Sequence, residues 1–304
     1  MHCRTNWRAR RLNDALQRLL RRLDNERLLL LPNQLRERME ALELLDAYFP
    51  DIPRPVTVGE SYSEELNRRA RAIHARLEAV NCELYECIRN EIQRGTRPET
   101  LHRWVRSSAT SADVAGPVSG MGYDYLDELI SGVLQFEEPN EATIHRESEK
   151  VFYQPTPARH IFSLIGQTAL TEADVLVDLG SGLGHVPLMV SICTPARCTG
   201  IELEAMYVER ARQCAQKLNL NKITFIHQDV RAADLSAGTV FYLYTPFTGS
   251  VLSHALALLR RESETRQIRI CTYGPCTPIV AEESWLETTG EPETNRIALF
   301  RSRA

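Results

Sequence analysis

The residues best suited to chemistry lie in the segment 175–184, which reads VLVDLGSGLG. Its first three residues form a short apolar run typical of a strand buried on both faces, and Asp178 follows them. Glycines stand at positions 180, 182 and 184, and the run HVPLMVSI after them predicts a helix. This order places backbone N–H groups and a helix N-terminus against a ligand. The carboxylate of Asp178 would attract an ammonium group and repel a pyrophosphate.

Two further acids end predicted strands. The run CTGIELEA at 198–205 predicts a second parallel strand ending in Glu202, and ITFIHQDV at 223–230 predicts a third ending in Asp229. Ligands of open α/β sheets bind outside the carboxyl ends of the strands, and an acid at the end of the second strand can accept both hydroxyls of a ribose. The sequence therefore predicts a ligand site lined by carboxylates at the ends of three neighbouring strands, with Glu202 placed to accept the hydroxyls of a ribose.

The spacing D-x-G-x-G-x-G resembles the first motif of class I methyltransferases that use S-adenosyl-L-methionine. YQPTP at 153–157 is similar to the Y-x-P-T-P segment of a group of bacterial methyltransferases and to the corresponding segment of the non-SET histone lysine methyltransferases. The resemblance implies that this turn encloses the methionine end of the cofactor, that Asp229 receives the adenine amino group and that the next N–H meets a ring nitrogen. The implied cofactor-binding residues are Thr156, Asp178, Gly180, Ser181, Gly182, Gly184, Glu202, Leu203, Asp229 and Val230.

The remaining patterns supply the elements that would position these residues. TVFYLYTPF at 239–247 and QIRICTYG at 267–274 predict two more strands, and the C-terminal runs predict a closing antiparallel pair. Before the first strand, Thr156 is expected to cap a helix that has Pro157 at its first position. We expect an α/β fold: a seven-stranded Rossmann-like methyltransferase sheet, mostly parallel with an antiparallel last strand, over residues 151–304.

Helical leucine spacing predicts an all-helical N-terminal module over residues 1–106, including helices over 8–31, 34–49 and 63–94. Residues 107–150 predict a flexible linker and an acidic lid segment, which contains a short helix from Tyr123 to Leu134. The helical module is a candidate surface for a homo-oligomer or for another partner.

The fourth predicted strand would supply the floor of the acceptor pocket, from Tyr244, Thr245, Pro246 and Phe247. Amino-group methyltransferases carry N-P-P-Y or a variant here, and the Asn is absent from this chain. Tyr153, His145 and Tyr244 are the candidate catalytic residues, and His160 is a further candidate base. The expected reaction moves the sulfonium methyl by in-line displacement to an N or O nucleophile of an unidentified acceptor, a small molecule or a protein lysine.

Three other interpretations stay open. The glycines could form an ordinary tight turn, and the chain could be a non-catalytic methyltransferase-fold module whose helical N-terminus recruits a partner. A nicotinamide-dependent oxidoreductase would explain Gly180, Gly182 and Glu202, although G-x-G-x-G is not the G-x-G-x-x-G spacing that dinucleotides require.

Composition limits the alternatives further. The chain has 304 residues and a net charge of −4, so no overall field attracts nucleic acid. Residues 1–40 hold ten arginines and five acids, which we interpret as a solvated amphipathic face. The eight cysteines predict free buried thiols and no metal site, although Cys193/Cys198 and Cys271/Cys276 have spacings that metal pairs can use. No secretory signal or membrane span is evident, so we expect a cytoplasmic protein without membrane contacts.

Overall fold

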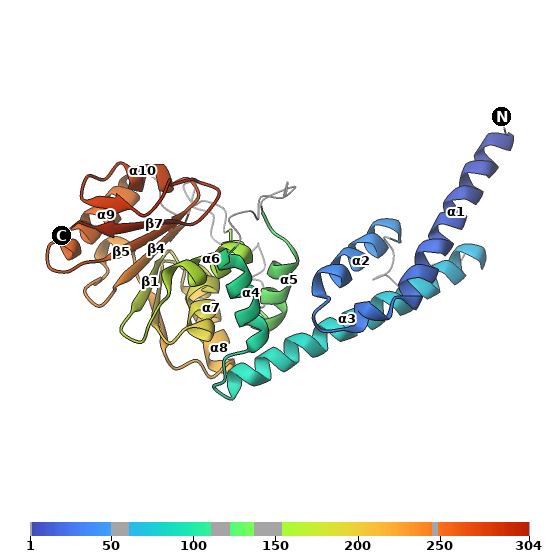
Figure 1. Ribbon diagram of the computed structural model, residues 1–304, viewed down its shortest axis with the longest axis horizontal. Coiled ribbons are helices and arrows are strands. Elements are labelled where there is room, and N and C mark those ends of the chain that lie inside the picture. Colours follow the sequence, from blue (N-terminus) through green and yellow to red (C-terminus); the bar gives the residue numbers. More distant parts are fainter. Residues whose placement is uncertain (1, 50–60, 111–121, 137–153, 245–248, 304) are drawn as a thin grey trace. The chain divides into compact units, whose positions relative to one another are not determined.

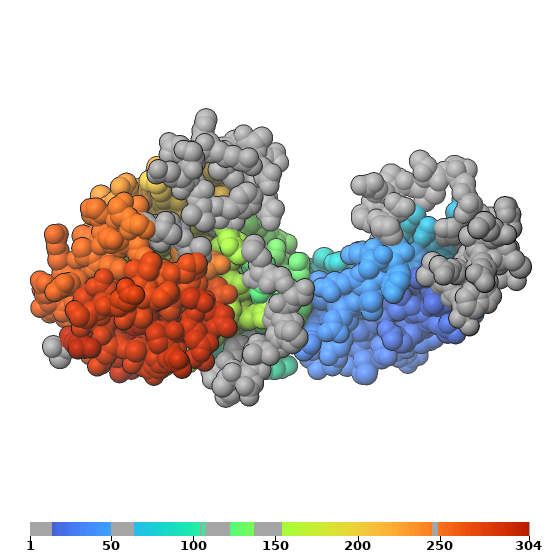
Figure 2. All heavy atoms as spheres, turned by 90° about the horizontal axis from the view of Figure 1, so that it is seen from above, coloured from blue at the N-terminus to red at the C-terminus, as the bar shows by residue number. Residues whose placement is uncertain are grey.

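The computed structural model describes residues 2–49, 61–110, 122–136, 154–244 and 249–303. The chain divides into two compact units, Met1–Cys87 and Ile88–Ala304, so the division falls inside helix α3 (Ser61–Gln93). Figure 2 shows the first unit in blue to cyan and the second mainly in green to red. The domain limits predicted at residues 106 and 150 stay predictions.

The first unit is helical, as its leucine spacing predicts. It contains α1 (His2–Asn25), the 3-10 helix η1 (Arg27–Leu30), α2 (Leu35–Tyr48) and most of α3. The helix predicted over 8–31 is therefore wrong at its end, because the chain leaves the α-helix at Asn25. Arg38 is fully buried and donates hydrogen bonds to the carbonyls of Leu29 and Leu31, which holds η1 against α2.

The second unit begins with helices that precede the sheet. They are α4 (Glu99–Thr110), α5 (Tyr125–Leu134) and α6 (Ala158–Thr168). Most of α4 was not predicted, and the predicted linker begins at residue 107, inside this helix. The Asp124 carboxylate caps α5 by accepting the Leu126 N–H, and Asp127 reaches back to the Asp124 N–H. This capping box fixes where α5 begins, two residues later than predicted.

Seven strands form one sheet, in the order β3-β2-β1-β4-β5-β7-β6. Strands β1 to β5 run parallel, and β7 is antiparallel to both of its neighbours. The predicted fold class is thereby confirmed. The strands are β1 (Val175–Leu179), β2 (Arg197–Glu202), β3 (Ile223–His227), β4 (Val240–Tyr244), β5 (Arg269–Tyr273), β6 (Leu286–Thr288) and β7 (Ala298–Ser302).

Helices cover both faces of this sheet (Figure 1). One face packs against α9 (Gly249–Ser263) and α10 (Thr277–Ala281), and alternate residues of β1, Val175, Val177 and Leu179, enter that core. The other face carries α6, α7 (His185–Cys193) and α8 (Ala205–Lys217). Leu176 and Asp178 point to this second face because side chains alternate along a strand. Asp178 is thus a buried carboxylate on an otherwise apolar strand.

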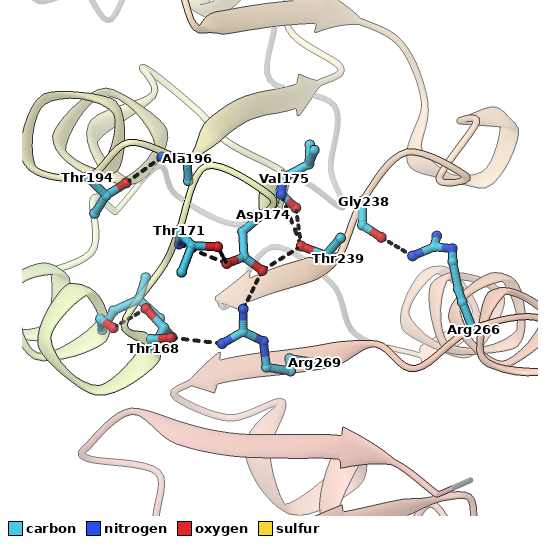
Figure 3. Close-up of polar contacts among 11 residues, drawn as sticks. Thr168, Thr171, Asp174, Val175, Thr194, Ala196, Gly238, Thr239, Arg266 and Arg269 are labelled. Atoms are coloured by element: carbon cyan, nitrogen blue, oxygen red, sulfur yellow. Dashed lines mark hydrogen bonds and ion pairs between the residues drawn. The ribbon is translucent and has the colours of Figure 1, made fainter.

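The amino-terminal edge of the sheet is held by a polar network around Asp174 (Figure 3). Its carboxylate accepts hydrogen bonds from Thr171, from the Thr239 hydroxyl and from the Arg269 guanidinium, which also donates to the Thr168 carbonyl. Burial alone would raise the pKa of Asp174, but these hydrogen bonds and the Arg269 charge together lower it. The network joins the starts of β1, β4 and β5, opposite the edge where the three strand-end acids lie.

We expect Asp174→Asn to lower the free energy of unfolding at pH 7 by roughly 1–3 kcal/mol, since hydrogen-bonded charged groups contribute about that much. The folded-state pKa lies below the ordinary value of 3.8, so this contribution is present above about pH 4 and is lost as the pH falls through the lowered pKa. Urea unfolding at pH 7 and near pH 3 measures the difference in the free energy of unfolding between Asp174→Asn and the native chain. This difference should be smaller near pH 3 than at pH 7. The neighbouring exposed Glu172→Gln is the control, and an equal difference at both pH values would contradict the assignment.

Candidate functional site

Asp178 is the most unusual group in the second unit. It stands in β1 level with Gly200 of β2 and Tyr242 of β4, and only 4 % of it is exposed. Its carboxylate makes no hydrogen bond or ion pair within the part of the chain that the structure describes. Burial, and then the nearby charge of Glu202, raises the pKa of Asp178 well above its usual value. A buried carboxylate without a partner is costly, so a cationic ligand would stabilise it.

The glycine loop after β1 is tied to the end of β2. The N–H groups of Gly180 and Ser181 donate to the Ile201 carbonyl, and the Gly182 N–H donates to the Glu202 carboxylate over 2.8 Å. The Gly184 N–H donates to the Ser181 carbonyl. Four loop N–H groups thus already have acceptors, and the neighbouring side chains are acidic. This arrangement does not suit a pyrophosphate, which weighs against the dinucleotide interpretation.

Close packing explains the last glycine of the motif. Gly184 has a φ of +83°, and a Cβ atom there would lie 2.5 Å from the ring of Phe225 on β3. A Cβ at Gly200 would meet the same ring at 2.6 Å and the Ser181 hydroxyl at 2.7 Å. The loop can therefore lie directly on β2 and β3 only because both positions lack side chains.

Two oxygen groups complete the loop. The Ser181 Oγ is buried and has no hydrogen-bond partner in the described structure. The Glu202 carboxylate accepts from the Gly182 N–H with one oxygen and from the Glu204 N–H with the other, each at 2.8 Å. A carboxylate has about four acceptor positions, so Glu202 is held rigidly and keeps capacity for two more donors. A vicinal diol, such as that of a ribose, supplies two.

The residues expected near an adenine lie beyond Glu202. Leu203 is 53 % exposed, which is unusual for leucine, and its carbonyl contacts the His227 ring over 3.0 Å. Asp229 caps the 3-10 helix η3 (Val230–Ala232), and its carboxylate is paired with the Arg231 guanidinium, which lowers the pKa of Asp229. An adenine amino group would share this carboxylate with Arg231. Val230 is buried in the core, which leaves its backbone as the part that a ligand could meet.

The turn before α6 differs from the prediction in one informative way. Pro157, not Thr156, is the N-cap residue of α6. The Thr156 side chain instead forms a hydrogen bond of 2.9 Å with the Tyr242 hydroxyl, and both residues are buried. The Tyr123 hydroxyl donates to the Pro155 carbonyl, and the Ala158 N–H donates to Asp127, whose pKa burial raises to about 6. The turn is thus held both from the sheet and from α5.

Aromatic rings meet where β4 and β5 end. The rings of Tyr244 and Tyr273 lie 4.9 Å apart, and the His160 ring lies 4.2 Å from that of Tyr273. Burial, and then the Arg159 charge, lowers the pKa of His160 to about 4. Burial, with the nearby Tyr244, raises the pKa of Tyr123 to about 12. His160 and Tyr123 are therefore neutral at pH 7, and the rings of Tyr244, Tyr273 and His160 lie together at the carboxyl edge of the sheet.

Several predicted site residues lie outside the described residues. They are the candidate catalytic residues Tyr153 and His145 and the pocket residues Thr245, Pro246 and Phe247. The prediction missed Tyr242, Tyr273 and Tyr123. A signal for the first was present, because Tyr242 stands two residues before Tyr244 in a strand and so shares its face.

Two cavities lie away from the glycine loop and the strand-end acids. Cavities of about 320 Å³ and 310 Å³ lie toward the amino-terminal edge of the sheet, one beside Arg97 and Cys193 and the other beside Arg269 and Leu299. Ligands of such sheets bind at the opposite edge, so we do not assign the site to these cavities.

Across the described ranges, no three His, Cys, Asp or Glu side chains converge as metal ligands do. None of the described helices combines the length and hydropathy needed to cross a bilayer.

Comparison with known proteins supports a methyltransferase resemblance. The sequence model of the histone methylation protein DOT1 family matches residues 143–236, which confirms the predicted similarity over that stretch. No match was found among curated proteins. The DOT1 family match spans the glycine loop and the acids at the ends of the first three strands.

Similar solved structures include an RNA methyltransferase from Salinibacter ruber in complex with S-adenosyl-L-homocysteine (24 % identity, 49 % of this chain and 92 % of that chain, TM-score 0.39). Another is a Pyrococcus abyssi tRNA (uracil-54, C5)-methyltransferase, also with S-adenosyl-L-homocysteine (17 %, 49 % and 39 %, TM-score 0.38). A third is a precorrin-6y C5,15-methyltransferase from Geobacter metallireducens (15 %, 54 % and 95 %, TM-score 0.38). Similarities at this level do not assign a substrate.

The packing of the loop gives a testable prediction about Gly184. Gly95 is the comparison, because it has a φ of +74° but open space where a Cβ would be added. We expect Gly95→Ala to lower the free energy of unfolding by about 1–2 kcal/mol from backbone strain alone. Gly184→Ala carries similar strain and adds the contact with Phe225, so it should cost roughly 1–3 kcal/mol more. Urea unfolding of both variants measures the difference. Equal losses would show that Phe225 does not restrict the loop.

Proposed function

We propose that this protein is a methyltransferase that uses S-adenosyl-L-methionine and moves the methyl group to an N or O nucleophile of an acceptor, a small molecule or a protein lysine. The cofactor supplies a sulfonium-bound methyl group for in-line displacement. The chain's own task is to hold the cofactor and the acceptor in line, which can lower the barrier by about 7–11 kcal/mol. The match to the histone methylation family supports the lysine option.

The observation that carries this proposal is the buried carboxylate of Asp178, which has no hydrogen-bond or ion-pair partner among the residues that the structure describes. It lies at the carboxyl edge of the sheet, and the buried Ser181 hydroxyl in the loop after it has no hydrogen-bond partner among those residues either. An α-ammonium group would give Asp178 a charged donor, and hydrogen bonds of this kind contribute about 1.5–3 kcal/mol. Few cofactors join an ammonium group to a nucleoside, and S-adenosyl-L-methionine is one that does.

The neighbouring groups suit the rest of such a ligand. Glu202 has two acceptor positions left for ribose hydroxyls, the exposed Leu203 offers an apolar surface to an adenine, and Asp229 with the Val230 N–H offers polar groups at its edge. Gly180 and Gly182 let the backbone lie close to the ligand, since no side chain stands between them, and Gly184 lets the loop pack against Phe225 beneath it. Thr156 lies at the methionine end in this proposal.

The acceptor would enter beside the rings of Tyr244, Tyr273 and His160. A nucleophile must lose a proton during transfer, and a neutral histidine can accept one. Because its pKa is lowered to about 4, His160 is neutral at pH 7 and is available for this role, although a base of low pKa is weak. Tyr153 and His145 remain further candidate bases.

A second candidate function is that of a binding module, which binds the cofactor but does not catalyse methyl transfer. It is favoured by the absent Asn at 244–247 and by exposed leucines of the first unit, of which Leu28 is 58 % and Leu31 44 % exposed. In that case the helical residues would recruit a partner or a second copy. Absence of labelled methyl transfer to any tested acceptor, together with intact cofactor binding, would distinguish it.

The proposal predicts how cofactor affinity changes with pH. The pKa of unliganded Asp178 is raised, so its carboxyl group holds a proton above pH 3.8 and must release it to pair with an ammonium. The affinity for S-adenosyl-L-homocysteine should therefore rise with pH until that raised pKa is passed. Calorimetry in buffers of different ionisation enthalpy should show proton release on the rising part of the curve.

The variant Asp178→Asn tests the same point. It should bind S-adenosyl-L-homocysteine about ten- to a hundredfold more weakly, because one charged hydrogen bond is lost, and its affinity should lose this pH dependence. Asp234→Asn removes an exposed carboxylate outside the site and should behave as the native chain. If Asp178→Asn binds as tightly as the native chain, Asp178 is not the ammonium site.

A further inference from the structure

Tyr242 is a buried polar residue to which the proposed reaction gives no role. It stands on β4 level with Asp178 of β1, so the two side chains leave the same face of the sheet. Only 1 % of Tyr242 is exposed, yet its hydroxyl lies 2.9 Å from the Thr156 Oγ. Burial raises the pKa of Tyr242 well above its usual value against the lowering effect of Thr156, and the Asp178 charge adds to the rise. The hydroxyl is therefore protonated.

The hydroxyl groups of Tyr242 and Thr156 have one more donor proton than the hydrogen bond between them requires. A tyrosine and a threonine hydroxyl each carry one donor proton, and the single bond between them uses only one. Within the described residues neither oxygen has another partner. A buried donor without an acceptor is costly, so the second proton can stabilise a ligand that brings an acceptor to this point.

We propose that Tyr242 is a positioning residue that orients the Thr156 hydroxyl to donate to the carboxylate of the cofactor's methionine end, while Asp178 accepts the ammonium of the same group. This inference rests on the proposed function, because it requires a cofactor with both charges. The Tyr242 hydroxyl acts through Thr156, and the Tyr242 ring is anchored in the middle of strand β4. The pair would thus recognise the negative half of the zwitterion, and Asp178 the positive half.

The turn that carries Thr156 is held in a way that suits this role. Tyr123 and Asp127 fix its backbone at Pro155 and Ala158, on either side of the threonine. The Tyr242 hydroxyl then sets the orientation of the Thr156 side chain, which the backbone contacts leave free. Fixed backbone and fixed rotamer together pre-organise the donor.

Calorimetric titration with two ligands tests the inference. S-adenosyl-L-homocysteine carries both charges, and its decarboxylated analogue keeps the ammonium alone. Tyr242→Phe and Thr156→Val should each weaken binding of S-adenosyl-L-homocysteine about tenfold, as expected for one hydrogen bond to a charged group, and leave binding of the analogue unchanged. The double variant should lose no more than either single variant, because the two hydroxyls act as one unit. Tyr85→Phe in the helical unit is the matched control and should bind both ligands as the native chain does.

Other results would overturn the inference. Equal losses for both ligands would mean that Tyr242 supports only the shape of the site, and an unchanged Tyr242→Phe or additive losses would exclude the coupled pair. If thermal unfolding shows that Tyr242→Phe does not fold, the comparison of Thr156→Ser with Thr156→Val tests the inference instead. Serine keeps the hydroxyl, so Thr156→Ser should still bind S-adenosyl-L-homocysteine more tightly than the decarboxylated analogue, as the native chain does. Failure of the native chain to bind S-adenosyl-L-homocysteine at all would overturn the proposed function, and this inference with it.

Discussion

The second unit depends on a buried carboxylate that has no partner among the residues that the structure describes. Asp178 projects from the interior strand β1, between Gly200 and Tyr242 on the neighbouring strands, where an apolar residue would be the ordinary choice. Burying an ionised group costs several kcal/mol unless it is paired, which is why burial raises the pKa of Asp178 well above its usual value. A structural role does not explain such a group, because hydrogen-bonding partners would then surround it, as they surround Asp174 at the other edge of the sheet.

The structure around Asp178 is rigid where a ligand needs it. The glycine loop uses its own N–H groups to bind Ile201 and Glu202, and Phe225 fills the space under Gly184 and Gly200. The loop therefore does not rearrange around a phosphate and instead presents oxygen atoms. Carboxylates, hydroxyls and neutral aromatic rings favour ligands that are cationic or rich in donors, which is the charge pattern of a sulfonium nucleoside with an ammonium group.

Much of this arrangement could be predicted from the sequence, for physical reasons. Apolar runs ending in Asp178, Glu202 and Asp229 gave the strands and their common edge, because parallel strands end on one side of a sheet. Contacts between distant segments could not be predicted: the Thr156–Tyr242 bond joins residues 86 positions apart, and the pairing of Asp229 with Arg231 competes with the expected role of that acid. The helix start was mistaken because a threonine before proline suits a cap equally well, and only the fold shows that Tyr242 binds its hydroxyl.

The most direct test is a crystal structure of the protein with S-adenosyl-L-homocysteine. The account predicts the ligand's ammonium nitrogen about 2.7–2.9 Å from the Asp178 carboxylate, as in charge-assisted hydrogen bonds, with the ribose hydroxyls on Glu202. A ligand bound in one of the cavities at the amino-terminal edge, or bound over the glycine loop with its ammonium group turned away from Asp178, would contradict it.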